Sequence, residues 1–75
     1  MEKVFGKIKW FKKEKGYGYI IGYDEESYFF ELLNCIDEDY KENEEVKFIP
    51  NYGKMNYASE VEKVNDNYGN KWYKK

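Results

Sequence analysis

The sequence contains no histidine, and its one cysteine, Cys35, has no second cysteine to pair with. An intramolecular disulfide and a zinc site built from cysteine and histidine are therefore excluded. The chain also lacks the side chain that most often acts as a general base, and no serine or cysteine is paired with one, so we expect no enzymatic activity and no cofactor. Residues 37–39 (Asp-Glu-Asp) could hold a divalent cation, but an acidic loop is more often only solvated, and we predict no metal site.

Long hydrophobic runs are absent as well. No apolar stretch approaches the length of a transmembrane helix, and the N-terminus carries no signal-peptide hydrophobic region. Together with the single cysteine, this predicts a soluble, monomeric, cytoplasmic protein with no membrane partner and no small-molecule substrate. Seventy-five residues suffice for one small domain. We place it at residues 1–64 and predict that residues 65–75 form a mobile polar tail.

Charged residues make up 37% of the chain, and the two signs are unevenly distributed along it. The net charge is −2, yet residues 1–23 carry six lysines against two glutamates, and residues 24–45 carry ten acidic residues against one lysine. Residues 46–75 are again positive, with six lysines against three acids. The acids that follow the third predicted strand are expected to form a solvated surface. A molecule with one positive aromatic face and a negative back would depend on stacking more than on phosphate contacts.

Aromatic residues are abundant. They make up 21% of the chain, which is more than so small a core can bury, so some rings must be exposed. In residues 15–20 (Lys-Gly-Tyr-Gly-Tyr-Ile) the two-residue period of a strand puts Tyr17 and Tyr19 on one face and Gly18 and Ile20 on the other. Because the second face is the core face, the tyrosines are predicted to point outward. Rings interleaved with cations are typical of a surface that stacks bases along a phosphate backbone.

Turn signals divide the chain into five short strands and no long helix. We expect them at residues 4–11, 17–23, 27–32, 45–50 and 58–64, with a short helical turn near residues 32–35. Such a pattern indicates a small closed barrel, because closure removes unpaired strand edges.

Strand alternation also assigns the faces of individual rings. If the first three strands form a meander, Phe29 joins the two outward tyrosines, whereas Tyr28, Phe30 and Leu32 face the core. At the end of the first strand, twist or a bulge is expected to turn both Trp10 and Phe11 to solvent.

The segments Gly-Lys-Ile-Lys-Trp-Phe (6–11), Lys-Gly-Tyr-Gly-Tyr-Ile (15–20) and Tyr-Phe-Phe (28–30) resemble the bacterial cold-shock domain. The resemblance covers about residues 3–64. It implies an all-β, small five-stranded antiparallel OB-fold barrel that binds single-stranded RNA or DNA and acts as an RNA chaperone. It also implies nucleic-acid-binding roles for Lys7, Lys9, Trp10, Phe11, Lys15, Tyr17, Tyr19 and Phe29, with Tyr40 as an aromatic from the loop after the third strand.

Two positions depart from the family pattern. Glu31 and Leu32 stand where the family has a histidine and a further aromatic residue, so a carboxylate lies where a polynucleotide would pass. A lysine across the sheet could neutralise it. Glu31 and the acidic segment favour an alternative function, a protein-interaction barrel that holds a peptide on the same aromatic patch. The lysines between Lys3 and Lys15 oppose that alternative.

Overall fold

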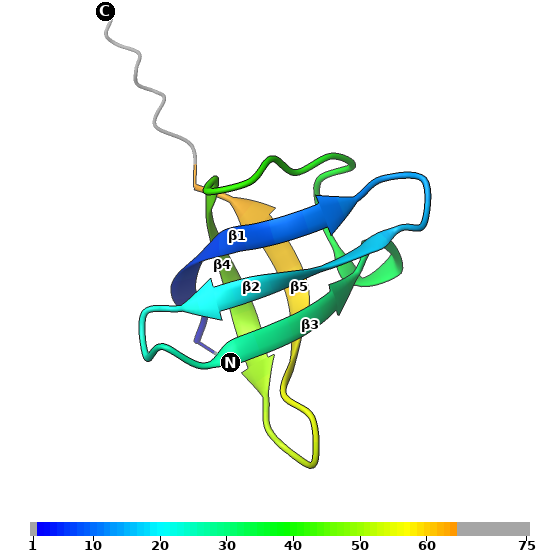
Figure 1. Ribbon diagram of the computed structural model, residues 1–75. Helices are drawn as coiled ribbons and strands as arrows, with labels where there is room; N and C mark the ends of the chain where they lie inside the picture. The colour runs from blue at the N-terminus through cyan, green and yellow to red at the C-terminus, as the bar shows by residue number, and fades with distance from the viewer. Residues whose placement is uncertain (1, 65–75) are drawn as a thin grey trace, which may run out of the picture.

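The structure is a computed structural model that describes residues 2–64. Its elements are β1 (Val4–Lys12), β2 (Tyr17–Gly22), β3 (Ser27–Glu31), the short 3-10 helix η1 (Leu32–Asn34), β4 (Glu45–Asn51) and β5 (Tyr57–Lys63). The strands close into a barrel in the order β1-β2-β3-β5-β4 (Figure 1). The predicted five-stranded all-β barrel is confirmed, and each strand end lies within one residue of its expected position. The predicted tail at residues 65–75 lies outside the described residues.

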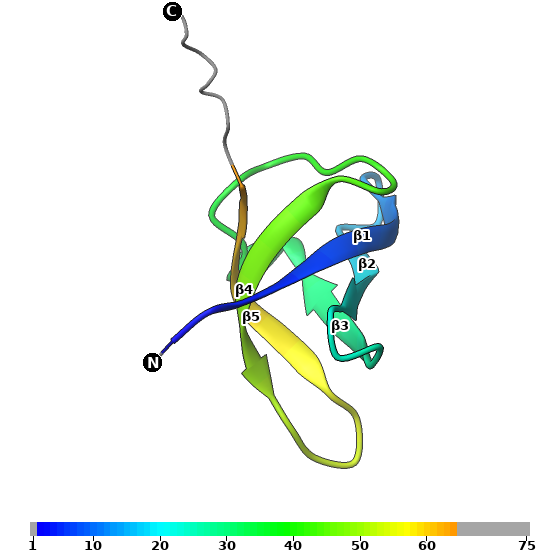
Figure 2. The same cartoon turned by 90° about the vertical axis from the view of Figure 1, so that its left-hand side faces the viewer.

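The strands form two groups on opposite sides of the barrel. β1, β2 and β3 make an antiparallel meander, and β4 pairs antiparallel with both β1 and β5. The remaining contact is parallel: Phe29 of β3 lies opposite Tyr57 of β5, and Cys35 bridges to Val61 farther along the same seam. Figure 2 shows that the hairpin joining β4 and β5 extends beyond the barrel. No helix in the described part of the chain is long and apolar enough to cross a bilayer.

The barrel interior holds the residues that alternation assigns to it. The buried apolar and aromatic side chains are Ile8, Ile20, Tyr28, Phe30, Tyr40, Val46, Phe48, Ala58 and Val61. The inward orientation of Tyr28 and Phe30 is confirmed, and Leu32 packs against this cluster while remaining partly exposed. Full burial of one such side chain contributes roughly 1.5–3 kcal/mol, so this cluster is the main source of the barrel's stability.

Part of the acidic segment at residues 24–45 fastens the long loop to the barrel instead of only facing solvent. The carboxylate of Asp37 accepts a hydrogen bond from the backbone N–H of Lys63 at 2.7 Å. The ammonium group of Lys63 lies 3.6 Å from the carboxylate of Glu44. Asp37 thus ties the loop to β5, and the charge of Glu44 is partly balanced by Lys63.

Gly18 allows β1 and β2 to approach closely at the point where the aromatic residues gather. A Cβ atom at this position would lie 2.3 Å from the carbonyl oxygen of Trp10 and 2.9 Å from the Cα of Phe11. Both neighbours are backbone atoms of a paired strand, so neither can move aside without breaking the pairing. The absence of a side chain at Gly18 is therefore a condition for the local register of β1 and β2.

We predict that Gly18→Ala lowers the free energy of unfolding by at least about 1–3 kcal/mol, the usual cost of overpacking. Gly53→Ala is the matched control. Its Cβ would meet no atom closer than the carbonyl oxygen of Met55 at 4.0 Å, so its effect should stay within about 0.5 kcal/mol. Urea denaturation measures both. Equal stability of the two variants would contradict the close approach.

Candidate functional site

A β-bulge in β1 decides which rings reach the surface. Ile8 lies opposite Ile20, but Trp10 lies opposite Tyr19, so β1 has one extra residue, Lys9, between these pairs. An extra residue shifts the alternation of the strand that follows it. Trp10 consequently shares the outer face with Tyr19, against the inward position that strict alternation would give it.

The same shift turns Phe11 inward, and here the prediction of two solvent-facing rings is wrong. Phe11 lies opposite Gly18 and is only half exposed. Its ring stacks on that of Phe30, with centroids 5.7 Å apart and planes 14° apart, and the edge of Tyr40 completes the contact. Because one face of Phe11 is covered by the core, this residue supports the barrel and does not present an open face.

Trp10, Tyr17, Tyr19 and Phe29 form a continuous group of four half-buried rings on the outer surface of β1–β3, which we call the stacking face. The ring centroids of Trp10 lie 5.9 Å from those of Tyr17 and 5.3 Å from those of Tyr19. Phe29 closes the group at 5.8 Å from Tyr17 and 5.5 Å from Tyr19. The structure thus brings together four of the five rings that the sequence predicted on this face, and Phe11 is the exception.

The planes of these rings are inclined to one another. The interplanar angles are 69° and 59° at Trp10, and 39° and 66° at Phe29. No contact within the group is a parallel stack like that of the two core phenylalanines. Edge and tilted contacts are favourable for aromatic pairs and leave ring faces available to a further planar partner.

Lysines border the stacking face. Lys12 lies opposite Tyr17, and its Nζ sits over the Trp10 ring at 5.6 Å from the centroid, close enough for a cation–π contact. The first strand was expected to end at residue 11, so Lys12 was not among the predicted site residues. The alternation of rings and cations continues one residue past the expected end of the strand. That pattern could have added Lys12 to the predicted site.

The predicted lysines of the site, Lys7, Lys9 and Lys15, are all exposed. Within residues 2–64, none of them takes part in an ion pair. Gly16, next to Lys15, has a φ of 74°, which suits glycine, and its carbonyl accepts a hydrogen bond from the N–H of Leu32 at 2.8 Å. This bond holds the loop that carries Lys15 beside the end of β3.

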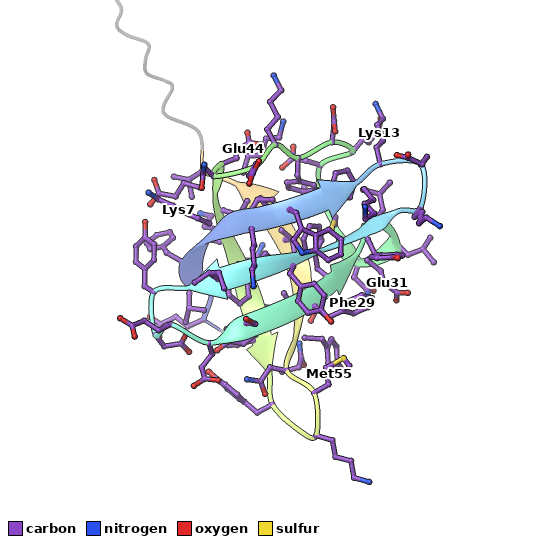
Figure 3. All side chains as sticks on the ribbon, viewed as in Figure 1. Lys7, Lys13, Phe29, Glu31, Glu44 and Met55 are labelled. Carbon is purple, nitrogen blue, oxygen red and sulfur yellow. The ribbon has the colours of Figure 1, made fainter. Side chains whose placement is uncertain are left out.

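Glu31 lies at the edge of the stacking face. It is opposite Tyr17 in the β2–β3 pairing and exposed, and Figure 3 shows it on the same side of β3 as Phe29. In the described part of the chain no lysine forms an ion pair with it. The cross-strand neutralisation considered above is therefore not present here, and the carboxylate stands beside the rings.

A groove of about 220 Å³ continues from Phe29 toward β5, lined in part by Glu31, Met55 and Tyr57. Met55 and Tyr57 are 59% and 46% exposed. Sequence analysis missed both, because they join Phe29 only through the parallel closure of the barrel, which no local pattern of residues reveals. The outer surface of β3 therefore ends in an apolar groove with a carboxylate on its rim.

Tyr40 does not lie on this surface, so its burial contradicts the nucleic-acid-binding role that the resemblance implied for this loop residue. It is 3% exposed, and its hydroxyl donates to the carbonyl of Val61 at 2.8 Å. Its ring packs edge-on against Phe30 with centroids 5.5 Å apart. Burial raises the pKa of Tyr40 and keeps the phenol neutral. Tyr40 thus anchors the long loop to the core.

The described residues offer little other chemistry. Within residues 2–64, no group of three or more acidic or cysteine side chains is placed to hold a metal ion. Burial raises the pKa of the Cys35 thiol to about 11, and the thiol donates to the carbonyl of Glu31 at 3.2 Å. The thiolate, which is the nucleophilic form, is therefore scarce at neutral pH.

No family model and no curated protein matches the sequence. Among solved structures, the chain is similar to a Drosophila Unr structure titled CSD456, where CSD stands for cold-shock domain. The TM-score is 0.73 at 20% sequence identity, and the match covers 88% of this chain. The chain spans only 28% of the length of that neighbour. At this identity the likeness shows the fold alone, the five-stranded OB-fold barrel of a cold-shock domain.

Proposed function

We propose that this protein binds single-stranded RNA or DNA by stacking unpaired bases on Trp10, Tyr17, Tyr19 and Phe29. The observation that carries the proposal is the joining of these four rings on the outside of the barrel with their planes inclined. Stacking on an aromatic side chain is worth about 1–3 kcal/mol per base and tolerates any base, since every base has a π-face. The resulting binding has little sequence preference.

The lysines supply the electrostatic part of the interaction. Lys7, Lys9, Lys12 and Lys15 all come from β1 or the loop after it, so the cations line one side of the stacking face. Their exposed ammonium groups can follow the phosphates of a strand whose bases lie on the rings. With a net charge of −2, the molecule gains more from stacking than from attraction at a distance.

Weak, sequence-tolerant contacts of this kind suit an RNA chaperone of the cold-shock type. Such a protein holds bases unpaired and so prevents RNA from forming secondary structure, without hydrolysis and without a cofactor. We propose that it does so as a monomer in the cytoplasm. Two observations support this assignment to the cold-shock type. Residues 6–11, 15–20 and 28–30 resemble the bacterial cold-shock domain, and the structural neighbour has the same fold.

The direct test is a fluorescence titration of Trp10 in a Trp72→Phe background, in which Trp10 is the sole tryptophan. We expect oligo-dT and oligo-rU to quench it and duplex DNA to leave it unchanged, because paired bases have no free faces to offer. Equal quenching by duplex and single strands would refute stacking. Quenching by neither, together with capture of an extended peptide, would favour the protein-interaction barrel instead.

Replacement of single rings tests the stacking face in detail. Tyr17→Ala, Tyr19→Ala and Phe29→Ala should each weaken oligonucleotide binding by about 1–3 kcal/mol, the cost of one lost stacked base. Tyr52→Ala is the control, because it removes a tyrosine that is 67% exposed and belongs to the far hairpin. Calorimetric titration measures the affinities, and thermal melts confirm folding. A control variant as weak as the others would disprove the assignment of the face.

Glu31 should oppose binding. An ionised carboxylate at roughly 6 Å from a phosphate costs on the order of 0.7–3 kcal/mol for an effective dielectric constant between about 80 and 20. Glu31→Gln should therefore tighten single-strand binding several-fold, whereas Glu2→Gln, the same charge change ahead of β1, should not. Affinities measured at one fixed salt concentration decide the matter. Weaker binding by Glu31→Gln would mean that the carboxylate accepts a hydrogen bond from a base.

A further inference from the structure

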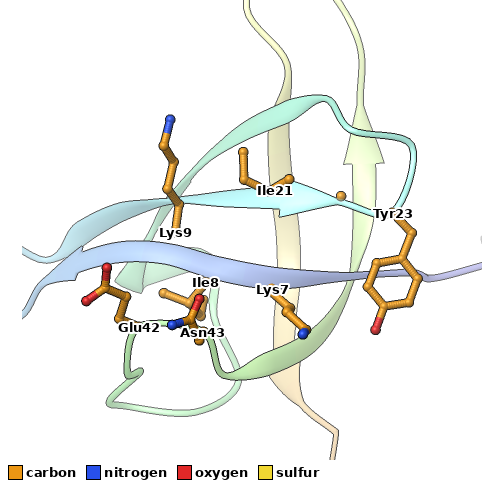
Figure 4. A pocket seen from close by; sticks show the side chains of 8 residues that line it. Lys7, Ile8, Lys9, Ile21, Tyr23, Glu42 and Asn43 are labelled. Carbon is orange, nitrogen blue, oxygen red and sulfur yellow. The ribbon is translucent and has the colours of Figure 1, made fainter.

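A second hollow lies on the outer face of the barrel, beyond the stacking face. Its volume is about 350 Å³, within the range of roughly 300–1,000 Å³ that small-ligand sites occupy. It lies over β1 (Figure 4). Ile21 of β2 and Tyr23, just after β2, line one side, and Asn43 of the long loop lines the other. We call it the β1–β2 pocket. Lys7 and Lys9 of β1 also line the pocket.

The lining combines an aromatic ring, an apolar side chain and two cations. Lys7 lies opposite Ile21 in the β1–β2 pairing, so both side chains share the outer face. The Tyr23 ring is held from two sides: its hydroxyl donates to the carboxylate of Glu45, and its ring meets Phe5 with centroids 6.3 Å apart. A ring fixed in this way loses little side-chain entropy when it binds a planar partner.

The loop side of the pocket is also fixed in place. The N–H of Asn43 donates to the carbonyl of Ile8 at 2.7 Å, and the N–H of Ile8 donates to the carbonyl of Glu44 at 2.9 Å. These bonds continue the antiparallel pairing of β1 with β4 into the turn that precedes β4. They place the side-chain amide of Asn43, which can both donate and accept, at the rim of the pocket.

The β1–β2 pocket lies on the same outer surface as the stacking face, because its Ile21 shares one face of β2 with Tyr19. Tyr19 and Tyr23 are four residues apart along one strand and its end, a distance of about 13 Å at the usual rise of a β-strand. Lys7 and Lys9 lie along the same stretch of β1 and are exposed, and neither forms an ion pair among residues 2–64. A polyanion that leaves Trp10 in this direction would pass both ammonium groups.

We propose that the β1–β2 pocket binds a further nucleotide of the same single strand, with its base against Ile21 and Tyr23 and its phosphate at Lys7 and Lys9. This inference rests on the proposed function and extends its site along β1. Glu42, on the opposite rim, would repel a phosphate there, which places the phosphate on the lysine side. The binding site then has two parts, a four-ring face and one separate pocket.

The dependence of affinity on strand length tests this proposal. We would titrate labelled oligo-dT of about four and of about ten nucleotides, lengths within the usual range of site sizes for an OB fold, and follow fluorescence anisotropy. Tyr23→Ala should weaken binding of the longer strand about three- to tenfold and leave the shorter strand unchanged. Lys7→Gln removes a cation that also borders the stacking face, so it should weaken the longer strand by a larger factor than the shorter one. Glu42→Gln should tighten only the longer one. Lys54→Gln, on the β4–β5 hairpin, controls for the loss of one positive charge.

Tyr19→Ala separates failure of the pocket from failure of the proposed function. If it weakens both strands while Tyr23→Ala changes neither and Lys7→Gln weakens both by the same factor, the stacking face stands and the pocket proposal is overturned. If Tyr19→Ala changes neither strand, the proposed function itself fails. Competition with thymidine monophosphate is a further test. The proposal is supported if this mononucleotide lowers the affinity for the longer strand to that for the shorter one. Binding of the mononucleotide at Tyr23 without such competition overturns it.

Discussion

The extra residue at Lys9 is the constraint on which the outer surface depends. It reverses the alternation of β1, so that Trp10 pairs with Tyr19 outside the barrel and Phe11 pairs with Gly18 inside it. Without the bulge, the indole would face the core and a phenylalanine would face solvent. Gly18 makes the arrangement possible, because any side chain there would meet the backbone of β1 at the bulge.

Positive and negative side chains are used in different parts of the barrel. The lysines that accompany the rings on β1 form no ion pair with any residue between 2 and 64. Part of the acidic segment holds the long loop, as Asp37 and Glu44 do at Lys63. A protein with a negative total can in this way present a local surface that suits a polyanion. Glu31 is the exception, an exposed carboxylate on the side of the rings.

Local sequence predicted most of the fold and the centre of the site, because both depend on strand alternation. The positions of Tyr17, Tyr19 and Phe29 follow from a period of two, and turn residues set the strand limits. Phe11 and Tyr40 were misassigned for a different reason. The direction of a bulge and the docking of a long loop are decided by packing against residues far away in the chain, which no local pattern encodes. The closure that brings Tyr57 beside Phe29 is non-local in the same sense.

The central claim is that single strands bind on the outer surface of β1, β2 and β3. A ¹⁵N–¹H NMR titration of the full chain with oligo-dT tests it directly, since it reports on every backbone amide and on the indole N–H of Trp10. We expect the indole signal and the amides around Tyr17, Tyr19 and Phe29 to shift together, while those of Val46 and Phe48 in β4 stay in place. Shifts concentrated on β4 and its hairpin, with the Trp10 indole unmoved, would contradict the account.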